Sequence, residues 1–211
     1  SNTVAARYYL ALGLLGAKRF DEALVHLEQL RDASEPKELV SGVQAARATA
    51  LTALERHAEA IEALHSYLTL SPSGPDSEKC RAQLGVTCAR LQRWSEAERV
   101  FHQMQRQHND SQLYLSSLQY MAEAAYSHGQ RDFAKQLFNE MAQDSHPPEV
   151  VAQGLSGLAW LEYTGEGGGS AQKFERLLLR YPDSPLAAEA AMMRGQALEK
   201  MGRLEGAISM Y

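Results

Sequence analysis

Residues 91–104, which read LQRWSEAERVFHQM, decide the fold because they have the pattern of a turn followed by the second helix of a helical hairpin. Ala97 is a small residue at a point where two helices must approach closely. Phe101 and Met104 follow four and seven residues later, so they lie on the same helical face as Ala97. The stretch therefore predicts an apolar helix face that begins with a residue small enough for close contact.

The same pattern recurs at a step of 37 residues. The small residues at this step are Ala23, Ala60, Ala97 and Ala134. The residues four positions later are Leu27, Leu64, Phe101 and Phe138, and those seven positions later are Leu30, Tyr67, Met104 and Met141. A fixed period of about 20–50 residues marks a stacked-repeat protein. The sequence therefore predicts an all-α fold, a right-handed α-solenoid of stacked antiparallel helix hairpins, in which each copy buries its apolar face against the next.

Composition agrees with a folded chain and excludes some partners. The chain has 211 residues, of which 45% are hydrophobic and 22% charged, and its net charge is −5. No cluster of Lys and Arg suits a phosphate backbone, so we expect no nucleic-acid partner. No apolar run approaches the ~20 residues that span a bilayer, so we expect no membrane insertion by this fragment.

We expect one solenoid over residues 1–211, with about five and a half repeats. The predicted repeats are 3–36, 37–73, 74–110, 111–146, 147–183 and a truncated 184–211. In the fifth repeat, the run Gly165–Gly169 predicts a turn, and Ser170 takes the close-approach position because Phe174 follows four residues later. Ser95 and Glu98 suggest a capping box at a helix start. Ser1-Asn2 resembles a cloning scar and the chain stops within an expected helix, so we expect further sequence on both sides.

The repeated residues resemble the tetratricopeptide repeat, and the resemblance covers nearly the whole chain. The third copy offers Leu84-Gly85, Trp94, Ala97 and Phe101; the fourth Ala122, Ala125, Gly129, Ala134 and Phe138; the second Ala60, Leu64 and Pro72; the sixth Gly195, Leu198, Gly202 and Ala207. The period of 37 departs from the family's ~34, which predicts longer loops between repeats. Residues 174–185, FERLLLRYPDSP, also resemble bacterial envelope members of the family.

The resemblance implies that the first helix of each hairpin lines a concave groove that binds peptides. Carried over copy by copy, the leading groove candidates are Tyr8, Thr49, Val86, Glu123, Tyr126, Trp160 and Tyr163. The other positions in phase are Leu12, Leu15, Ala45, Thr52, Ala82, Ala89, Gln119, Ser156, Met192, Gln196 and Glu199. Exposed aromatic rings in a groove suit an apolar or proline-containing segment, but such rings also fill space between helices in many folds.

Other kinds of site find no support in the sequence. Chaperone-binding members of the family hold a peptide's C-terminal carboxylate with Lys and Asn side chains on successive first helices. At the matching positions of this chain only Lys79 could serve, so we expect no such carboxylate clamp. The seven histidines include no pair spaced four apart and no HExxH motif, so we expect no metal and no cofactor. Gly154-Leu155-Ser156-Gly157 lacks the G-x-S-x-G spacing of a nucleophile elbow, and no Gly-Lys-Ser/Thr follows Gly169 as a phosphate loop requires. We therefore expect no enzyme activity in this chain.

The predicted function is a protein–protein interaction scaffold or adaptor that binds a peptide or partner helix in the concave groove. Two alternatives stay open from sequence: a structural spacer or self-assembly module of a larger envelope protein, and a regulatory domain of an enzyme outside this fragment. The expected setting is the bacterial cytoplasm or periplasm, with any export signal outside this fragment.

Overall fold

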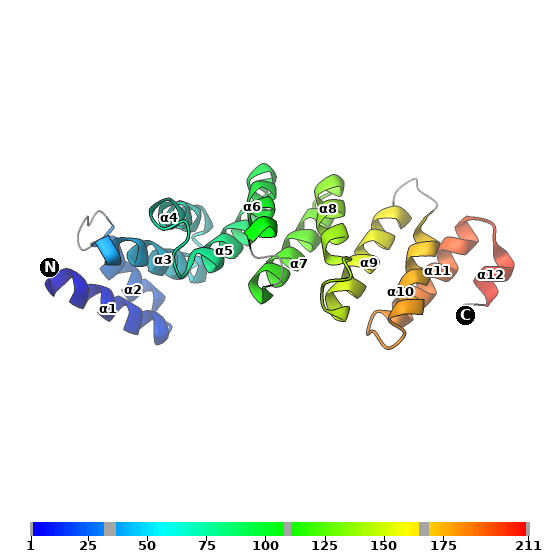
Figure 1. Ribbon diagram of the computed structural model, residues 1–211, viewed down its shortest axis with the longest axis horizontal. Helices are drawn as coiled ribbons and strands as arrows, with labels where there is room; N and C mark the ends of the chain where they lie inside the picture. Colours follow the sequence, from blue (N-terminus) through cyan, green and yellow to red (C-terminus); the bar gives the residue numbers. More distant parts are fainter. Residues whose placement is uncertain (1, 32–36, 108–110, 165–168, 210–211) are drawn as a thin grey trace. The chain divides into compact units, whose positions relative to one another are not determined.

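A computed structural model describes residues 2–31, 37–107, 111–164 and 169–209, and these residues form α-helices joined by turns (Figure 1). The chain divides into two compact units, Ser1–Asn109 and Asp110–Tyr211. The first contains α1 (Asn2–Gly16), α2 (Phe20–Glu28), α3 (Lys37–Ala53), α4 (His57–Leu70), α5 (Ser77–Arg90) and α6 (Trp94–Gln107). The second contains α7 (Gln112–Ser127), α8 (Arg131–Met141), α9 (Pro148–Tyr163), α10 (Ser170–Arg180), α11 (Ala187–Lys200) and α12 (Leu204–Ile208).

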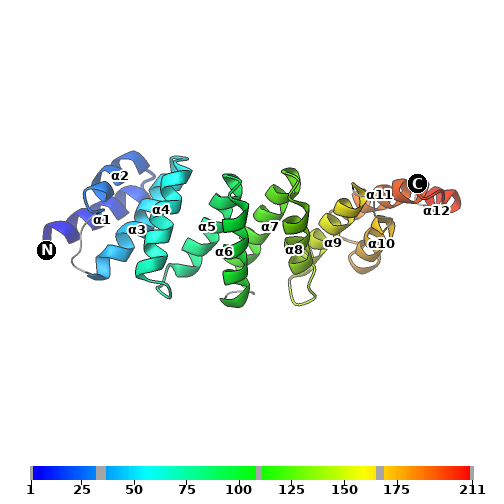
Figure 2. The ribbon, with the colours of Figure 1, turned by 90° about the horizontal axis from the view of Figure 1, so that it is seen from above.

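Within each unit, every helix packs against the next helix along the chain, so the helices pair as antiparallel hairpins (Figure 2). The first helices of neighbouring hairpins also touch, as α1 touches α3 and α7 touches α9. The single solenoid domain over residues 1–211, with the repeat boundaries given above, stays a prediction. The expected turn at Gly165–Gly169 falls mostly on residues 165–168, which lie outside the described residues.

The small residues at the 37-residue step are fully buried. Ala23, Ala60, Ala97 and Ala134 are each 0% exposed. In the fifth hairpin Ser170 is also buried, and Phe174 and Leu177, four and seven residues later, are 0% exposed. These two offsets match those of the other hairpins, which supports Ser170 as the residue at the close approach.

The hairpin turns that the structure describes share one backbone geometry. Their left-handed residues are Lys18, Glu55, Gln92, Gly129 and Gly202, with φ between 58° and 73°, and the first four follow one another at the 37-residue step. In the first hairpin the Lys18 amide donates to the Leu15 carbonyl, and the Arg19 amide donates to the Leu14 carbonyl, both at 2.9 Å. This is a Schellman motif, which satisfies the last carbonyl groups of a helix and usually needs glycine at the left-handed residue. Three of the five turns carry a residue with a side chain there.

The capping box predicted at Ser95 and Glu98 is wrong. Helix α6 begins at Trp94, and the carbonyl of Arg93 accepts a hydrogen bond from the Ala97 amide at 3.0 Å, so Arg93 occupies the cap position. The Schellman turn fixes this position because the helix must begin two residues after the left-handed residue. An ion pair with a glutamate three residues later recurs at the cap, in Arg19–Glu22, Arg56–Glu59 and Arg93–Glu96.

A second ion pair links neighbouring hairpins. Arg47 of α3 is 5% exposed and donates to Glu28 of α2, with an Nη2–Oε1 distance of 2.8 Å. In the other unit Arg194 of α11 donates to Glu175 of α10 at the corresponding positions. The charge of the buried Arg47 is therefore paired, as a buried guanidinium requires.

Gly154 lies where the backbone of α9 comes close to the backbone at the end of α8. A Cβ atom placed there would lie 2.6 Å from the Ala142 nitrogen and 2.8 Å from the Phe138 carbonyl oxygen. Both are backbone atoms, which cannot rotate away. The glycine-containing stretch at residues 154–157 is thus explained by helix packing.

The turn geometry predicts opposite effects of two substitutions. Gly129→Ala places a side chain at a left-handed residue, although no atom lies within 4 Å of its Cβ, so we expect a loss of about 1 kcal/mol in the free energy of unfolding. Gln92→Gly relieves the same strain, and we expect a gain of about 0.5 kcal/mol. Urea titration followed by circular dichroism measures both. An unchanged Gly129→Ala midpoint, or a less stable Gln92→Gly chain, contradicts this account of the turn.

Close packing predicts that Gly154→Ala lowers the free energy of unfolding by about 1–3 kcal/mol, because the backbones of α8 and α9 must move apart. Gly13→Ala is the matched control, since Gly13 is helical and exposed and no atom lies within 4 Å of its Cβ position. We expect that control to gain up to about 1 kcal/mol from higher helix propensity. Equal effects of the two substitutions in a urea titration would show that α8 does not constrain α9 at Gly154.

Candidate functional site

Five of the six groove positions predicted on α7 and α9 line one cavity in the Asp110–Tyr211 unit. The cavity has a volume of about 240 Å³. The predicted residues that line it are Gln119, Glu123, Tyr126, Ser156 and Trp160. The unit thus brings an amide, a carboxylate, a hydroxyl and two aromatic rings around one space.

Helix periodicity explains how these side chains meet. Glu123 and Tyr126 are spaced three apart on α7, and Ser156 and Trp160 are spaced four apart on α9, so each pair projects from one helix face. Between the two helices, Phe138 of α8 also lines the cavity. The Tyr126 and Phe138 rings meet edge to face, with centroids 6.4 Å apart. This aromatic contact orients one wall of the cavity.

Gly157 lets α9 approach the Phe138 ring. A Cβ atom at Gly157 would lie 2.3 Å from two carbons of that ring, so any side chain there would push Phe138 aside. Trp160 is half-buried and packs edge to face on Phe174, with centroids 6.2 Å apart. The cavity is therefore bounded by rings whose positions are set by packing before any ligand arrives.

Tyr163, the sixth predicted position, does not line this cavity. Its hydroxyl donates to the Gln196 side-chain oxygen at 3.3 Å, and the Lys200 ammonium lies 3.6 Å from the centre of its ring. Both partners belong to α11, so Tyr163 links the fifth and sixth hairpins. Its role in packing between helices is one of the two interpretations that the sequence left open.

The Ser1–Asn109 unit has a separate cavity of about 330 Å³. The groove candidates Tyr8 and Thr49 line it, together with Leu12, Leu15 and Ala45. Burial, and next the nearby Asp76 carboxylate, raise the pKa of Tyr8. Lys79 lines this cavity as a single lysine beside Asp76, and Val86, although half-buried, does not line it.

The two cysteines lie in this first unit and are buried. Cys80 lines the cavity but is only 3% exposed, and Cys88 is 0% exposed. Burial raises the pKa of the Cys80 thiol to about 11 and that of the Cys88 thiol to about 12. Both thiols are therefore protonated near neutral pH, which makes them poor nucleophiles.

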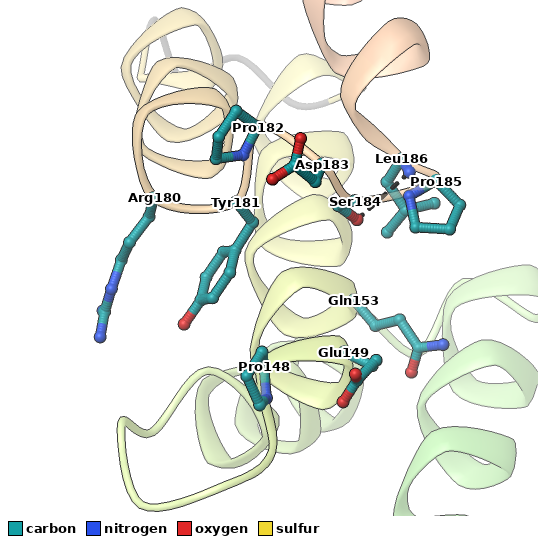
Figure 3. Close-up of a pocket in the computed structure, with 10 residues that line it drawn as sticks. All are labelled: Pro148, Glu149, Gln153, Arg180, Tyr181, Pro182, Asp183, Ser184, Pro185 and Leu186. Atoms are coloured by element: carbon teal, nitrogen blue, oxygen red, sulfur yellow. Dashed lines mark hydrogen bonds between the residues drawn. The ribbon is translucent and has the colours of Figure 1, made fainter.

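The largest of these cavities, about 520 Å³, lies in the second unit and was not predicted from sequence (Figure 3). Figure 3 shows Pro148, Glu149 and Gln153 extending from α9, with the loop that follows α10 beyond them. The loop residues that line the cavity are Tyr181, Pro182, Asp183, Ser184 and Pro185. These residues form the YPDSP stretch. The sequence marks that stretch as a turn between two helices, but it does not indicate that the turn lines a cavity with α9.

One cation borders this larger cavity, and it is already paired. Arg180 donates to the Asp144 carboxylate at 2.5 Å, and its guanidinium lies 5.6 Å from the centre of the Tyr181 ring. The hydrogen bond from Arg180 lowers the pKa of Asp144. Arg180 therefore contributes little free positive charge to the cavity.

The described cavities can offer noncovalent contacts to a ligand. The cavities present aromatic rings, amides and carboxylates, two of which, Glu149 and Asp183, line the largest one. Among residues 2–31, 37–107, 111–164 and 169–209, no three or more His, Cys, Asp or Glu side chains are grouped so that they could hold a metal ion. In the same residues, no helix has both the length and the apolar character needed to span a membrane.

Comparisons with known proteins agree with the repeat architecture. A family model described as "Tetratricopeptide repeat" matches residues 8–75 and 161–211. A search of curated proteins finds no match.

Solved structures of repeat proteins resemble the whole chain. PilW, a widely conserved type IV pilus biogenesis factor, is 17% identical with a TM-score of 0.52, covering 100% of this chain and 91% of that chain. MamA from AMB-1 is 16% identical with a TM-score of 0.53, covering 99% and 87%. A tetratricopeptide repeat protein from Parabacteroides merdae ATCC 43184 is 18% identical with a TM-score of 0.51, covering 98% and 75%. Similarity at these identities shows the fold alone.

The predicted fold class, an all-α solenoid of stacked antiparallel hairpins, is confirmed by the helices and by these structures. The family model covers more than half of the 211 residues, including the first two hairpins and the last. The chain belongs to the tetratricopeptide repeat family.

Proposed function

We propose that the Asp110–Tyr211 unit binds an extended peptide segment of a partner protein in the cavity between α7 and α9. The tetratricopeptide repeat fold is in general a scaffold for protein–protein interaction, and its members are generally not enzymes. The observation that supports the finer proposal is the convergence of Glu123, Tyr126 and Trp160 on one cavity.

The size and lining of the cavity favour a peptide side chain over a metabolite. Its volume of about 240 Å³ lies below the ~300–1,000 Å³ that is usual for small-molecule sites. Half-buried Trp160 and Tyr126 offer apolar area that a ligand would bury, and rigid aromatic side chains lose little entropy when they do so. An apolar peptide side chain seated between these rings would therefore gain affinity at low cost.

The polar lining supplies contacts for a peptide backbone. Gln119 donates to the Glu123 carboxylate at 3.1 Å, and Ser156 and Gln153 also line the cavity. Amide and hydroxyl groups can pair with the N–H and C=O groups of an extended chain, which would otherwise stay unsatisfied when buried. We infer that this polar edge fixes the direction of the peptide, while the rings supply most of the affinity.

The proposal predicts that Trp160→Ala weakens peptide binding at least tenfold, about the effect of losing an aromatic hot spot. Peptides are selected from a displayed random library on the whole chain, and their affinities are measured by fluorescence anisotropy. Trp94→Ala is the matched control, because Trp94 is half-buried in the other unit and borders neither cavity of the second unit. Peptides that bind Trp160→Ala as tightly as the unmodified chain would refute the site.

Intrinsic fluorescence gives an independent readout. The chain has two tryptophans, so Trp94→Phe leaves Trp160 as the single emitter. A selected peptide seated beside Trp160 removes water from the indole ring, and we expect its emission to shift to shorter wavelength in proportion to occupancy. Emission that does not change at saturating peptide places the peptide elsewhere on the chain.

A further inference from the structure

The two cavities of the second unit are neighbours. Gln153 of α9 and Leu186, which precedes α11, line both of them. The α9 residues along the combined space are Glu149, Gln153, Ser156 and Trp160, with spacings of four, three and four. These spacings place all four on one face of the helix. We call the combined space, from Trp160 to the YPDSP loop, the α9 trough.

The α9 trough is acidic. Three carboxylates line it, and Glu123, Glu149 and Asp183 are all exposed. Within the described part of the chain, Arg180 is the one lysine or arginine lining either cavity, and Asp144 accepts its hydrogen bond. Among the residues that the structure describes, no ion pair with a lysine or arginine is found for the three carboxylates. A ligand that brings positive charge would therefore complement the trough.

The carboxylates are distributed unevenly. Glu149 and Asp183 both line the larger cavity, from α9 and from the loop after α10, while the aromatic rings of Tyr126 and Trp160 line the smaller one. The trough therefore has the two rings together with Glu123 at one end and Glu149, at the start of α9, at the other, and it favours a peptide whose apolar and cationic side chains follow that order. Pro148 restricts the backbone next to Glu149, and Pro182 and Pro185 restrict the loop that carries Asp183.

Helix geometry sets the spacing between the two ends. Glu149 is about nine residues before the middle of the Ser156–Trp160 segment, which corresponds to about 13 Å at a rise of ~1.5 Å per residue. An extended peptide advances ~3.3 Å per residue, so about four residues cover this length. Because side chains of an extended chain alternate, residues four apart point to the same side.

We propose that the α9 trough binds an extended peptide with an apolar side chain between Tyr126 and Trp160 and a lysine or arginine four residues away, beside Glu149. The inference rests on the proposed peptide-binding function and adds the chemical class and register of the ligand. It also gives the larger cavity, which the predicted groove positions did not include, a role in specificity.

The test uses the whole 211-residue chain and synthetic peptides. The probe contains Leu-Ser-Thr-Ser-Lys between short Gly-Ser flanks, is acetylated and amidated so that only the lysine is charged, and carries a neutral fluorophore. Matched peptides replace Lys by Gln or by Glu, and a fourth shortens the spacing to Leu-Ser-Lys. Anisotropy titrations up to about 1 mM protein compare them at low and high salt.

We expect the Lys peptide to bind about fivefold tighter than the Gln peptide and the short-spaced peptide, and tighter still than the Glu peptide. High salt should reduce these differences. Glu149→Gln combined with Asp183→Asn should make the Lys and Gln peptides bind equally. Glu189→Gln is the matched control, since Glu189 is an exposed carboxylate in the first turn of α11, as Glu149 is in the first turn of α9. The control should keep the preference for lysine.

Two failures are distinguishable. Peptides that need Trp160 but bind equally whatever their charge or spacing overturn the ligand class and leave the proposed function standing. A tighter Glu peptide also overturns the ligand class, because Arg180 would then set the specificity. If all four peptides bind weakly and Trp160→Ala changes none of their affinities, the proposed function fails, and this inference fails with it.

Discussion

The close approach of two helices at a small side chain is the constraint on which the structure depends. Ala23, Ala60, Ala97 and Ala134 each lie fourth in the second helix of a hairpin, and each is fully buried. A methyl group there lets the backbones come close enough for the larger side chains four and seven residues later to interlock with the neighbouring helices. In a stacked array each hairpin contacts mainly its neighbours. The same close approach is therefore repeated from hairpin to hairpin, and the chain does not need one central core.

Within each unit, second helices pack against their own first helices and against the next ones along the chain, and parts of the first helices remain to line cavities. The five turns share one Schellman geometry, which fixes the phase of the second helix relative to the first. The phase in turn decides which faces of α7 and α9 border the space beside Phe138. A binding surface is therefore a consequence of the same repeat that stabilises the fold, and the side chains on it can vary while the packing positions stay small or apolar.

Much of this could be predicted from the sequence, because the information was periodic. The alanine step located the second helices, and repeat phase brought Tyr126 and Trp160 to one cavity. Contacts that break the period could not be predicted this way. Tyr163 pairs with Gln196 and Lys200, and the YPDSP loop borders a cavity with residues about 30 positions earlier in α9. The cap at Arg93 was missed because the turn geometry, and not side-chain propensity, sets where α6 begins.

The most direct test of the central constraint is to enlarge one buried alanine. Ala97→Leu adds three carbons where α6 must approach its neighbours, and overpacking of this kind typically costs about 1–3 kcal/mol. Ala58→Leu is the comparison, because Ala58 lies in α4 but is exposed. The account predicts a clearly lower urea midpoint for Ala97→Leu and a midpoint within error of the unmodified chain for Ala58→Leu. If Ala97→Leu unfolds at the same urea concentration as the unmodified chain, close approach at the repeated alanines does not organise this fold.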